Sequence, residues 1–382
     1  MIMDLTVIIV NHNVHLFLEQ CLASVRKACS GLAVEVIVID NASEADPYLC
    51  FSAIYPEVRF LRNIRNKGFS VANNWGFRMS HGRYVLMLNP DTVVGESSFR
   101  YLCSFMDAHP DVGAAGPKMI DARGRFHAES KRGFPTPWAA FCKLFGLLRL
   151  FPKSGYDLSY LSENDPQRVD VLSGAFMFIR RSVIDKVGLL DESFFMYGED
   201  IDLSWRIRKA GYLNYYLPLR LLHYKGESSR QNNELYLKNF YGAMQKFFRK
   251  YYPRSSRFFA WTISLGIGLI KLRSRFKRFW LGDKPQLPAV DRNVLIVGGS
   301  SSYETAKALC QEYIHGLASI SLLSPAEAET IPEGITDIAF ISPDLSFEDI
   351  LRRIEANGKA SGYRFVHHIC HPAADILISP SK

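Results

Sequence analysis

Apolar, β-branched runs alternate with segments of helical periodicity over the first 90 residues. The runs that predict buried strands are LTVIIV (5–10), VEVIVID (34–40), VRFLRN (58–63) and YVLMLN (84–89). Between them, Leu18, Leu22 and Val25 fall on one face of a predicted helix over residues 15–28, and another helix is predicted around residues 71–79. This alternation predicts an α/β fold with a doubly wound, mostly parallel sheet.

A second α/β pattern begins near residue 290. Strand-like runs at 294–297, 319–323, 337–342 and 364–369 accompany predicted helices, one of them over residues 347–358 and ending at Gly358. The pattern resembles a Rossmann-like fold, but VLIVGGSSSYETA lacks G-x-G-x-x-G, so we favour a regulatory or assembly module over a dinucleotide site. We therefore predict three parts: a large α/β domain over 1–250, a basic amphipathic segment and linker over 251–289, and a small α/β domain over 290–382.

The charge balance favours an anionic partner. The formal net charge is +8 and the isoelectric point is about 9.0, which suits a nucleotide, a phospholipid surface or nucleic acid. No nucleic-acid motif accompanies the basic stretch, so we expect no nucleic-acid partner. The seven cysteines are scattered and form no C-x-x-C pair, which argues against zinc and redox motifs and favours reduced thiols in the cytosol.

Two segments predict contact with a membrane surface. Residues 138–151 and 258–280 mix apolar and aromatic residues with lysine and arginine, as helices in a lipid headgroup region do. The longest uncharged apolar run, 258–270, is shorter than the roughly 18 residues of a spanning helix. The start, MIMDLTVIIVNHN, lacks the basic region of a signal peptide. We expect peripheral attachment, with helices packed on the main domain or a dimer contact as the alternative.

Polar residues follow directly after the predicted strands, where open α/β sheets bind ligands. Asp40 ends one strand, although an Asx turn or a helix cap would also explain it. Asp91 ends another strand after Pro90, and a carboxylate at such a turn suits Mg²⁺ or Mn²⁺. A plain turn is the alternative.

Two glycine-containing segments are further candidates. Residues 63–82 are rich in asparagine and glycine and carry basic side chains before a predicted helix, where an anion could bind. Gly174 precedes the strand-like residues 176–179, and a strand that approaches a ligand closely needs such a residue. A helix cap and a strand-start turn are the respective alternatives.

Three acids, Glu199, Asp200 and Asp202, lie in the aromatic stretch FFMYGEDIDLSWRIRKAGY (194–212). They fall in the first turn of a predicted helix that begins near Asp200 and stops at Gly211, where the macrodipole favours negative charge. The macrodipole alone does not explain carboxylates in so apolar a setting, because burying them without partners is costly. At least one of them is therefore a candidate for chemistry.

Seven motifs occur in one order: VIIVNHN, VIVIDNAS, NKGFSVANNWG, LNPDT, SGAFMFIRR, DESFFMYGEDIDLSWRIRKAGY and HYKGES. Together they resemble family 2 glycosyltransferases of the GT-A fold, especially the branch often labelled rhamnosyltransferases, over about residues 4–250. The resemblance implies a metal-dependent, inverting transfer from a nucleotide-sugar donor to an acceptor hydroxyl. It makes residues 1–250 a catalytic domain.

The resemblance also assigns roles by position. Asp200 would be the catalytic base, with Glu199 as an alternative base or an acceptor contact, and we expect the aromatic surroundings to raise the pKa of the base. Asp91 would help to bind the metal, and His223 would assist the metal or the diphosphate. An imidazole without a ligand is the alternative for His223. The donor contacts would be Val10, Asn11, Asn13, Asp40, Asn66, Lys67, Gly68, Asn73, Asn89 and Gly174. Where many members of the fold carry two aspartates in D-x-D, this chain has Asn89-Pro90-Asp91, with one carboxylate.

The implied partners are a dTDP-rhamnose donor, with UDP-hexoses as runners-up, and a lipid-linked saccharide acceptor in cell-surface polysaccharide synthesis. The implied location is cytoplasmic, on the inner face of the cell membrane. A sugar nucleotidyltransferase is one rival. The segment after the first strand, VNHNVHLFLEQ, lacks the glycine- and arginine-rich phosphate loop that is typical of that class. A non-catalytic membrane scaffold is another, although Asp91 and Asp200 are both present.

Overall fold

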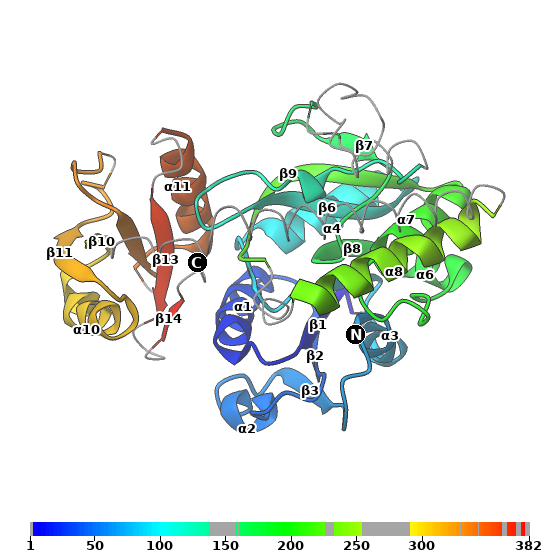
Figure 1. The fold of residues 1–382 in the computed structure, drawn as a ribbon, viewed down its shortest axis with the longest axis horizontal. Helices are drawn as coiled ribbons and strands as arrows, with labels where there is room; N and C mark the ends of the chain where they lie inside the picture. Colours follow the sequence, from blue (N-terminus) through cyan, green and yellow to red (C-terminus); the bar gives the residue numbers. More distant parts are fainter. Residues whose placement is uncertain are drawn as a thin grey trace, which may run out of the picture.

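The computed structural model contains two sheets, one of nine strands and one of five (Figure 1). We call the part up to residue 253 the N-terminal unit and the part from residue 291 the C-terminal unit. The described residues are 3–136, 158, 160–225, 233–253, 291–328, 330–342, 344–360, 365–371 and 376–378. The membrane-contact segments predicted at 138–151 and 258–280, and most of the predicted segment 251–289, lie outside these residues.

The first half of the N-terminal unit is parallel, as the apolar periodicity predicts. The elements are β1 (Leu5–Asn11), α1 (His15–Ala28), β2 (Val34–Asp40), α2 (Pro47–Phe51), β3 (Val58–Arg62), α3 (Phe69–Met79) and β4 (Tyr84–Leu88). The strands pair in the order β3-β2-β1-β4, all in parallel. Their carboxyl ends therefore meet at one edge, where ligands bind in such sheets.

The second half of this unit makes the sheet mixed. Its elements are β5 (Thr92–Val94), α4 (Ser98–Ala108), β6 (Val112–Ile120), the 3₁₀ turn η1 (Ala128–Ser130), β7 (Gln167–Val169), β8 (Phe176–Arg180), α6 (Arg181–Val187), α7 (Glu199–Lys209), β9 (Leu213–His223) and α8 (Asn233–Tyr251). Strand β8 lies antiparallel between β4 and β6, β6 is parallel to β9, and β5 and β7 are antiparallel to β9. Only β5, β7 and β8 oppose the other strands of this sheet, so the predicted α/β class with a mostly parallel sheet is confirmed.

Helices cover both faces of this sheet. One hydrophobic cluster joins α1 and α4 to the strands, and a second joins α3, α6 and α7 to them. Helix α8 packs on α7 through a third cluster of mainly aromatic side chains, among them Phe194, Phe247 and Phe248. The aromatic stretch that precedes α7 therefore serves this helix pair.

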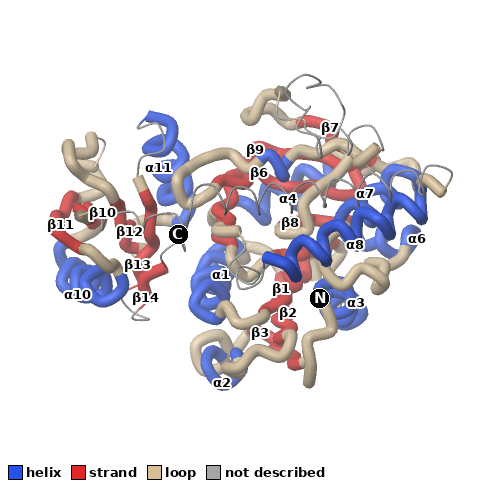
Figure 2. Tube along the Cα trace, viewed as in Figure 1, coloured by secondary structure: helices blue, strands red, loops and turns tan. Residues whose placement is uncertain are grey.

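The C-terminal unit is a smaller α/β layer (Figure 2). It consists of β10 (Arg292–Val297), the 3₁₀ turn η3 (Ser300–Ser302), α10 (Tyr303–Tyr313), β11 (Leu317–Leu323), β12 (Asp337–Ile341), α11 (Phe347–Ala360), β13 (Val366–His371) and β14 (Ile376–Ile378). The strand order is β11-β10-β12-β13-β14, with all pairs parallel except the last. The prediction that the second helix ends at Gly358 is wrong, since α11 continues to Ala360 and buries Gly358 in its packed face.

In the part of the chain that the structure describes, no helix combines the length and the apolar character needed to cross a membrane.

Candidate active site

The ends of β1 and β2 form a buried polar corner. Asn11 pairs with Asp40 across the two strands, and its Nδ2 donates to Asp40 Oδ1 and to Ser43 Oγ, both at 3.1 Å. The Ser43 amide donates to Asp40 Oδ2 at 3.0 Å, which is the Asx turn expected as an alternative. Asn11 Oδ1 is buried without a hydrogen-bond partner among the described residues. This corner can therefore still accept a bond from a ligand.

Two neighbours of this corner were predicted with it. Val10 is buried in the hydrophobic core beneath it. Asn13 adopts the left-handed backbone region with φ of 57°, and its amide donates to Ser43 Oγ at 2.9 Å. The loop after β1 is thus fastened to the loop after β2.

Asn41 organises the loop after β3. Its Nδ2 donates to Asn66 Oδ1 at 2.9 Å and to the Gly68 carbonyl at 3.2 Å, while its Oδ1 accepts from the Lys67 amide at 3.0 Å. Sequence analysis did not select Asn41 as a site residue, although its place directly after a strand-end aspartate was the available signal. The side chains of Asn66 and Lys67 are exposed, so they remain accessible to a ligand.

Gly68 fixes where this loop meets the segment before α7. Its φ is +85°, and a Cβ built on it would lie 2.5 Å from the Phe195 carbonyl oxygen. The Phe69 amide donates to that same oxygen at 2.7 Å. Asn73, one turn into α3, uses its Nδ2 to bond the Phe69 carbonyl at 3.0 Å. Its amide group therefore supports the start of the helix.

Asp200 is held from two sides at the start of α7. Its Oδ2 accepts from Arg132 Nη2 at 2.6 Å and from the Gly174 amide at 3.2 Å, and both ion-pair partners are largely buried. Arg132 also donates to the Leu172 carbonyl at 3.0 Å. Sequence analysis missed Arg132, because nothing in its local sequence marks it. The pair fixes the direction of the carboxylate.

Glu199 has a different environment. It is buried, and its Oε2 has no hydrogen-bond partner in the described part of the chain. Desolvation by burial, followed by the nearby charge of Asp200, raises the pKa of this carboxyl well above its ordinary value. Glu199, predicted as the alternative base, therefore has the raised pKa that the resemblance leads us to expect of the base.

Asp202 is a structural residue. Its fully buried carboxylate accepts from Arg206 Nε at 2.8 Å, from Lys250 Nζ at 2.6 Å and from the Tyr251 hydroxyl at 2.6 Å. The last two partners lie on α8. Asp202 therefore ties α7 to α8 and shares none of the hydrogen-bond partners described for Asp200.

Asp91 and His223 come together where β5 and β9 meet. Thr92 pairs with His223 in the ladder, and His223 Nε2 lies 3.4 Å from Asp91 Oδ1. Both side chains are buried, and His223 Nδ1 has no hydrogen-bond partner among the residues described. No cluster of three or more histidine, cysteine, aspartate or glutamate side chains suited to a metal occurs within the described ranges. The chain therefore offers two neighbouring metal-type ligands.

Backbone hydrogen bonds link the Asp91–His223 pair to Asp200 on α7. The Asn89 amide donates to the Ala175 carbonyl at 2.8 Å, and the preceding residue, Gly174, donates to Asp200. The end of β4, which leads into Asp91, is thereby placed beside the start of α7.

Comparison with known proteins adds the family. Residues 6–188 match the family described as Glycosyl transferase family 2. Over 241 residues the chain is 31% identical to N-acetylglucosaminyl-diphospho-decaprenol L-rhamnosyltransferase of Mycobacterium tuberculosis, covering 59% of this chain and 77% of that protein. The chain belongs to glycosyl transferase family 2.

A further relative of this family 2 glycosyltransferase is Low-salt glycan biosynthesis hexosyltransferase Agl10 of Haloferax volcanii. The identity is 30% over 213 residues, which is 55% of this chain and 63% of Agl10, so the match spans less than two thirds of that relative. Among solved structures, mannosyltransferase PcManGT from Pyrobaculum calidifontis, in complex with GDP-Man and Mn²⁺, aligns with a TM-score of 0.46 and 14% identity, over 81% of this chain and 80% of that one.

In this glycosyltransferase most of the predicted site residues form three groups besides the Asp91–His223 pair. Asn11, Asn13 and Asp40 share one hydrogen-bonded corner, Asn66 to Asn73 line the adjoining loop and helix start, and Asn89, Gly174 and Asp200 meet at the end of β4. The residues that sequence analysis missed, Asn41 and Arg132, connect and orient these groups.

Proposed function

We propose that this protein is a metal-dependent, inverting glycosyltransferase that moves a sugar from a nucleotide-diphosphate donor to an acceptor hydroxyl. The observation that carries the proposal is the link through Gly174 and Ala175, which sets the Asp91 turn beside the Asp200 carboxylate. Such a transfer needs stabilisation of the leaving diphosphate and removal of a proton from the acceptor, close to one another.

The donor would occupy the carboxyl edge of β1 to β4. Asn11, Asn13 and Asp40 would hold the nucleoside above Val10, where Asn11 Oδ1 is available as an acceptor. The exposed Asn66 and Lys67 would face the donor, Gly68 would set the course of their loop, and Asn89 and Gly174 would line the donor site beside Asp200. The Asn73 side chain bonds its own helix, so we propose an indirect role for it through the helix start.

The residues present fit a divalent cation. Asp91 Oδ1 and His223 Nε2 are an oxygen and an imidazole nitrogen, which Mn²⁺ accepts and Mg²⁺ accepts in part, and they lie close enough to share one ion. With two protein ligands, the donor's diphosphate oxygens would complete the coordination. When bound, a divalent ion supplies charge stabilisation to the departing diphosphate.

Asp200 would remove the proton of the acceptor hydroxyl. Arg132 pairs with its carboxylate and, with the Gly174 amide, fixes its direction. A positioned general base of this kind contributes roughly 10²–10⁴-fold to the rate. Glu199, whose raised pKa keeps it protonated near neutral pH, would donate a hydrogen bond to the acceptor.

The proposed substrates are taken from the names of the relatives. The mycobacterial relative is named for rhamnosyl transfer to a diphospho-decaprenol-linked acceptor and the haloarchaeal one for hexosyl transfer in glycan biosynthesis. We propose dTDP-rhamnose, or else a UDP-hexose, as donor and a lipid-linked saccharide as acceptor, in cell-surface polysaccharide synthesis. The proposed location is the cytoplasmic face of the cell membrane.

The test is donor hydrolysis and donor binding across a panel of nucleotide sugars, with Mn²⁺, Mg²⁺ or EDTA. We expect one donor to be turned over only with metal, and both Asp200→Asn and Asp91→Asn to lower turnover by about 10²-fold or more. Asp200→Asn should keep metal-dependent donor binding, whereas Asp91→Asn should lose it. Glu192→Gln, at an exposed ion pair with Arg78, is the matched control. Binding of no donor by the wild-type protein would contradict the proposal.

A further inference from the structure

The two units share one hydrophobic core. A single cluster contains Val93, Ile120, Ala122, Leu222 and Tyr224 of the N-terminal unit. The same cluster contains buried side chains of β10, β12 and α11, among them Phe347 and Ile350. The backbone amide and ring Nδ1 of His367 on β13 both contact the Ala122 carbonyl, at 3.1 and 2.7 Å. The C-terminal unit is therefore packed against strands β5, β6 and β9, as Figure 1 shows for α11 and β9.

Charged groups fix the position of α11 in this contact. The Glu96 carboxylate, in the turn between β5 and α4, accepts from the Phe347 amide at 2.7 Å and from the Glu348 amide at 2.8 Å. An acid of one unit thus caps the helix of the other. Farther along α11, Glu355 accepts from Lys118 Nζ at 2.6 Å, and both side chains are almost fully buried.

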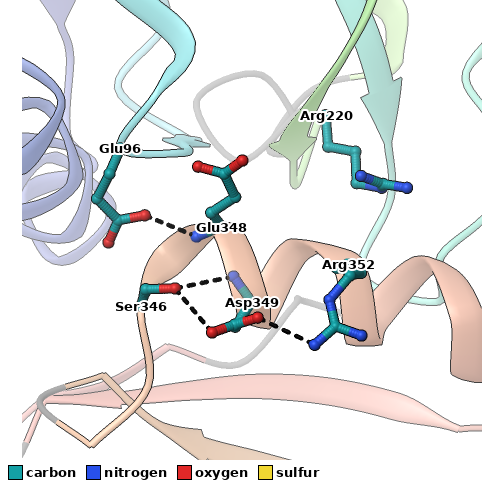
Figure 3. A pocket seen from close by; sticks show the side chains of 6 residues that line it. All are labelled: Glu96, Arg220, Ser346, Glu348, Asp349 and Arg352. Carbon is teal, nitrogen blue, oxygen red and sulfur yellow. Dashed lines mark hydrogen bonds and ion pairs between the residues drawn. The ribbon is translucent and has the colours of Figure 1, made fainter.

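A pocket lies between the two units beside the capped end of α11. Its volume is about 370 Å³. The side chains that line it, drawn in Figure 3, are Glu96, Arg220, Ser346, Glu348, Asp349 and Arg352. Because this end is open to water, removal of the Glu96 cap should loosen α11 without exposing the whole shared core.

The strands under this contact also carry the proposed metal pair. In a strand, successive side chains face opposite sides, so Leu222 enters the shared core while its neighbour His223 faces Asp91. On β5, Val93 pairs with Leu222 and enters the same core, two residues after Asp91. The Tyr224 amide donates to the Asp91 carbonyl at 3.0 Å, and Tyr224 belongs to the shared core as well.

We infer that docking of the C-terminal unit positions Asp91 and His223 for the metal–diphosphate, so that Glu96 and Glu355 are positioning residues for metal binding. The inference rests on the proposed function. It gives the C-terminal unit a role in the reaction without a ligand of its own. The corner at Asn11 and Asp40 lies on β1 and β2, and the C-terminal unit reaches that side mainly through β14 on α1. We therefore expect variants that loosen α11 to change this corner little.

The experiment uses the full chain with Glu96→Ala, Glu355→Gln and both together. Amide hydrogen exchange at Phe347 and Glu348 reports docking, and exchange at Tyr224 reports the metal-ligand turn. Binding of UDP and of dTDP is measured in EDTA, and Mn²⁺ binding is then measured at saturating nucleotide. Arg352→Gln, which removes an exposed pair within α11, is the control. Glu96→Gln, which keeps one acceptor oxygen, tests for partial rescue.

We expect the docking variants to exchange faster at all three amides and to bind Mn²⁺ about fivefold more weakly or worse, the lower end of typical coupling between sites. Nucleotide affinity in EDTA should stay within about twofold. Faster exchange in α11 with unchanged Mn²⁺ affinity would overturn the inference alone. Equal losses in EDTA and in Mn²⁺ would also overturn it, because they would indicate a general loss of structure. Failure of the wild-type protein to bind either nucleotide with Mn²⁺ would overturn the proposed function itself.

Discussion

At the scale of single residues, three acids within four positions have three different environments. Asp200 is paired with Arg132, Glu199 is buried with an unbonded oxygen, and Asp202 is saturated by partners on α7 and α8. The three acids are neighbours in the sequence, but the groups that bond them come from residues 132, 174 and 250, which are far apart in the chain. Sequence analysis could place the acids at a helix start but could not assign these partners.

Glu199 should make stability fall as pH rises. Its pKa is raised in the folded state, so between the ordinary glutamate value and the raised one the folded protein binds more protons than the unfolded chain, and stability decreases with pH. Glu199→Gln removes this pH dependence. Between pH 5 and pH 8, the free energy of unfolding of the variant should rise by at least about 1.4 kcal/mol relative to that of the wild type, the value of a one-unit pKa shift. Urea unfolding at the two pH values measures it. A constant difference between the two proteins would contradict the burial of a protonated carboxyl.

Gly68 should tolerate no side chain. Its left-handed backbone costs other residues about 1–2 kcal/mol, and a Cβ would also meet the Phe195 carbonyl. We expect Gly68→Ala to lower the free energy of unfolding by about 2 kcal/mol or more and to weaken donor binding. Gly211→Ala is the comparison, because its backbone is also left-handed but nothing lies within 4 Å of its Cβ position. An equal loss in both variants would show that the contact with Phe195 is unimportant.

At the scale of elements, the contact between α7 and α8 holds the acids in place. Trp205 of α7 packs against Phe247 and Tyr251 of α8, and Asp202 bonds Lys250 and Tyr251 beneath them. Helix α7 also contacts β9, which carries His223, so the contact between α7 and α8 supports both Asp200 and the strand of His223.

Loss of Asp202 should therefore destabilise the fold more than loss of an exposed acid. Asp202→Ala leaves Lys250, Arg206 and Tyr251 without their shared acceptor, and we expect a cost of about 2–4 kcal/mol in the free energy of unfolding. Glu57→Gln, at an exposed pair with Arg26, should change it by less than about 0.5 kcal/mol. Urea denaturation compares the two, and similar values would argue against the tie between α7 and α8.

Sequence periodicity predicted the elements with uninterrupted apolar runs. Strands β1, β2, β4 and β8 lie within about a residue of their predicted bounds, because each is buried and lacks breakers. Strands β6 and β9 were not predicted. The first contains Gly113, Gly116 and Pro117, and the second contains Pro218. The ladder between them shifts register between Gly116 and Lys118, which is how a sheet accommodates a proline.

At the scale of the whole molecule, the two units are joined by a buried ion pair that no sequence pattern indicated. Lys118 and Glu355 are 237 positions apart. The sequence around each of them does not distinguish it from an exposed charged residue. The site could be predicted in outline because its residues follow strand ends. The support from the C-terminal unit could not, since it depends on how separate parts of the chain pack.

Glu355 should contribute stability that acid removes. Burial opposes its ionisation, but hydrogen bonds from Lys118, Lys359 and Arg220 outweigh this and lower its pKa to about 2. Its contribution is therefore complete above the ordinary glutamate pKa and is lost as pH falls towards about 2. We expect Glu355→Gln to cost on the order of 2 kcal/mol at pH 6 and clearly less at pH 3.5, in urea unfolding. A pH-independent cost would mean that the charge of Glu355 is not what matters.

The cover over β5 has a consequence for solubility. β5 is a three-residue strand, Thr-Val-Val, at the end of the nine-stranded sheet. Its Val93 lies in the core shared with the C-terminal unit, whereas Val94 packs on the side of α1. Molecules in which the units separate would expose Val93 and the other apolar side chains of the shared core, and we expect such molecules to associate with one another.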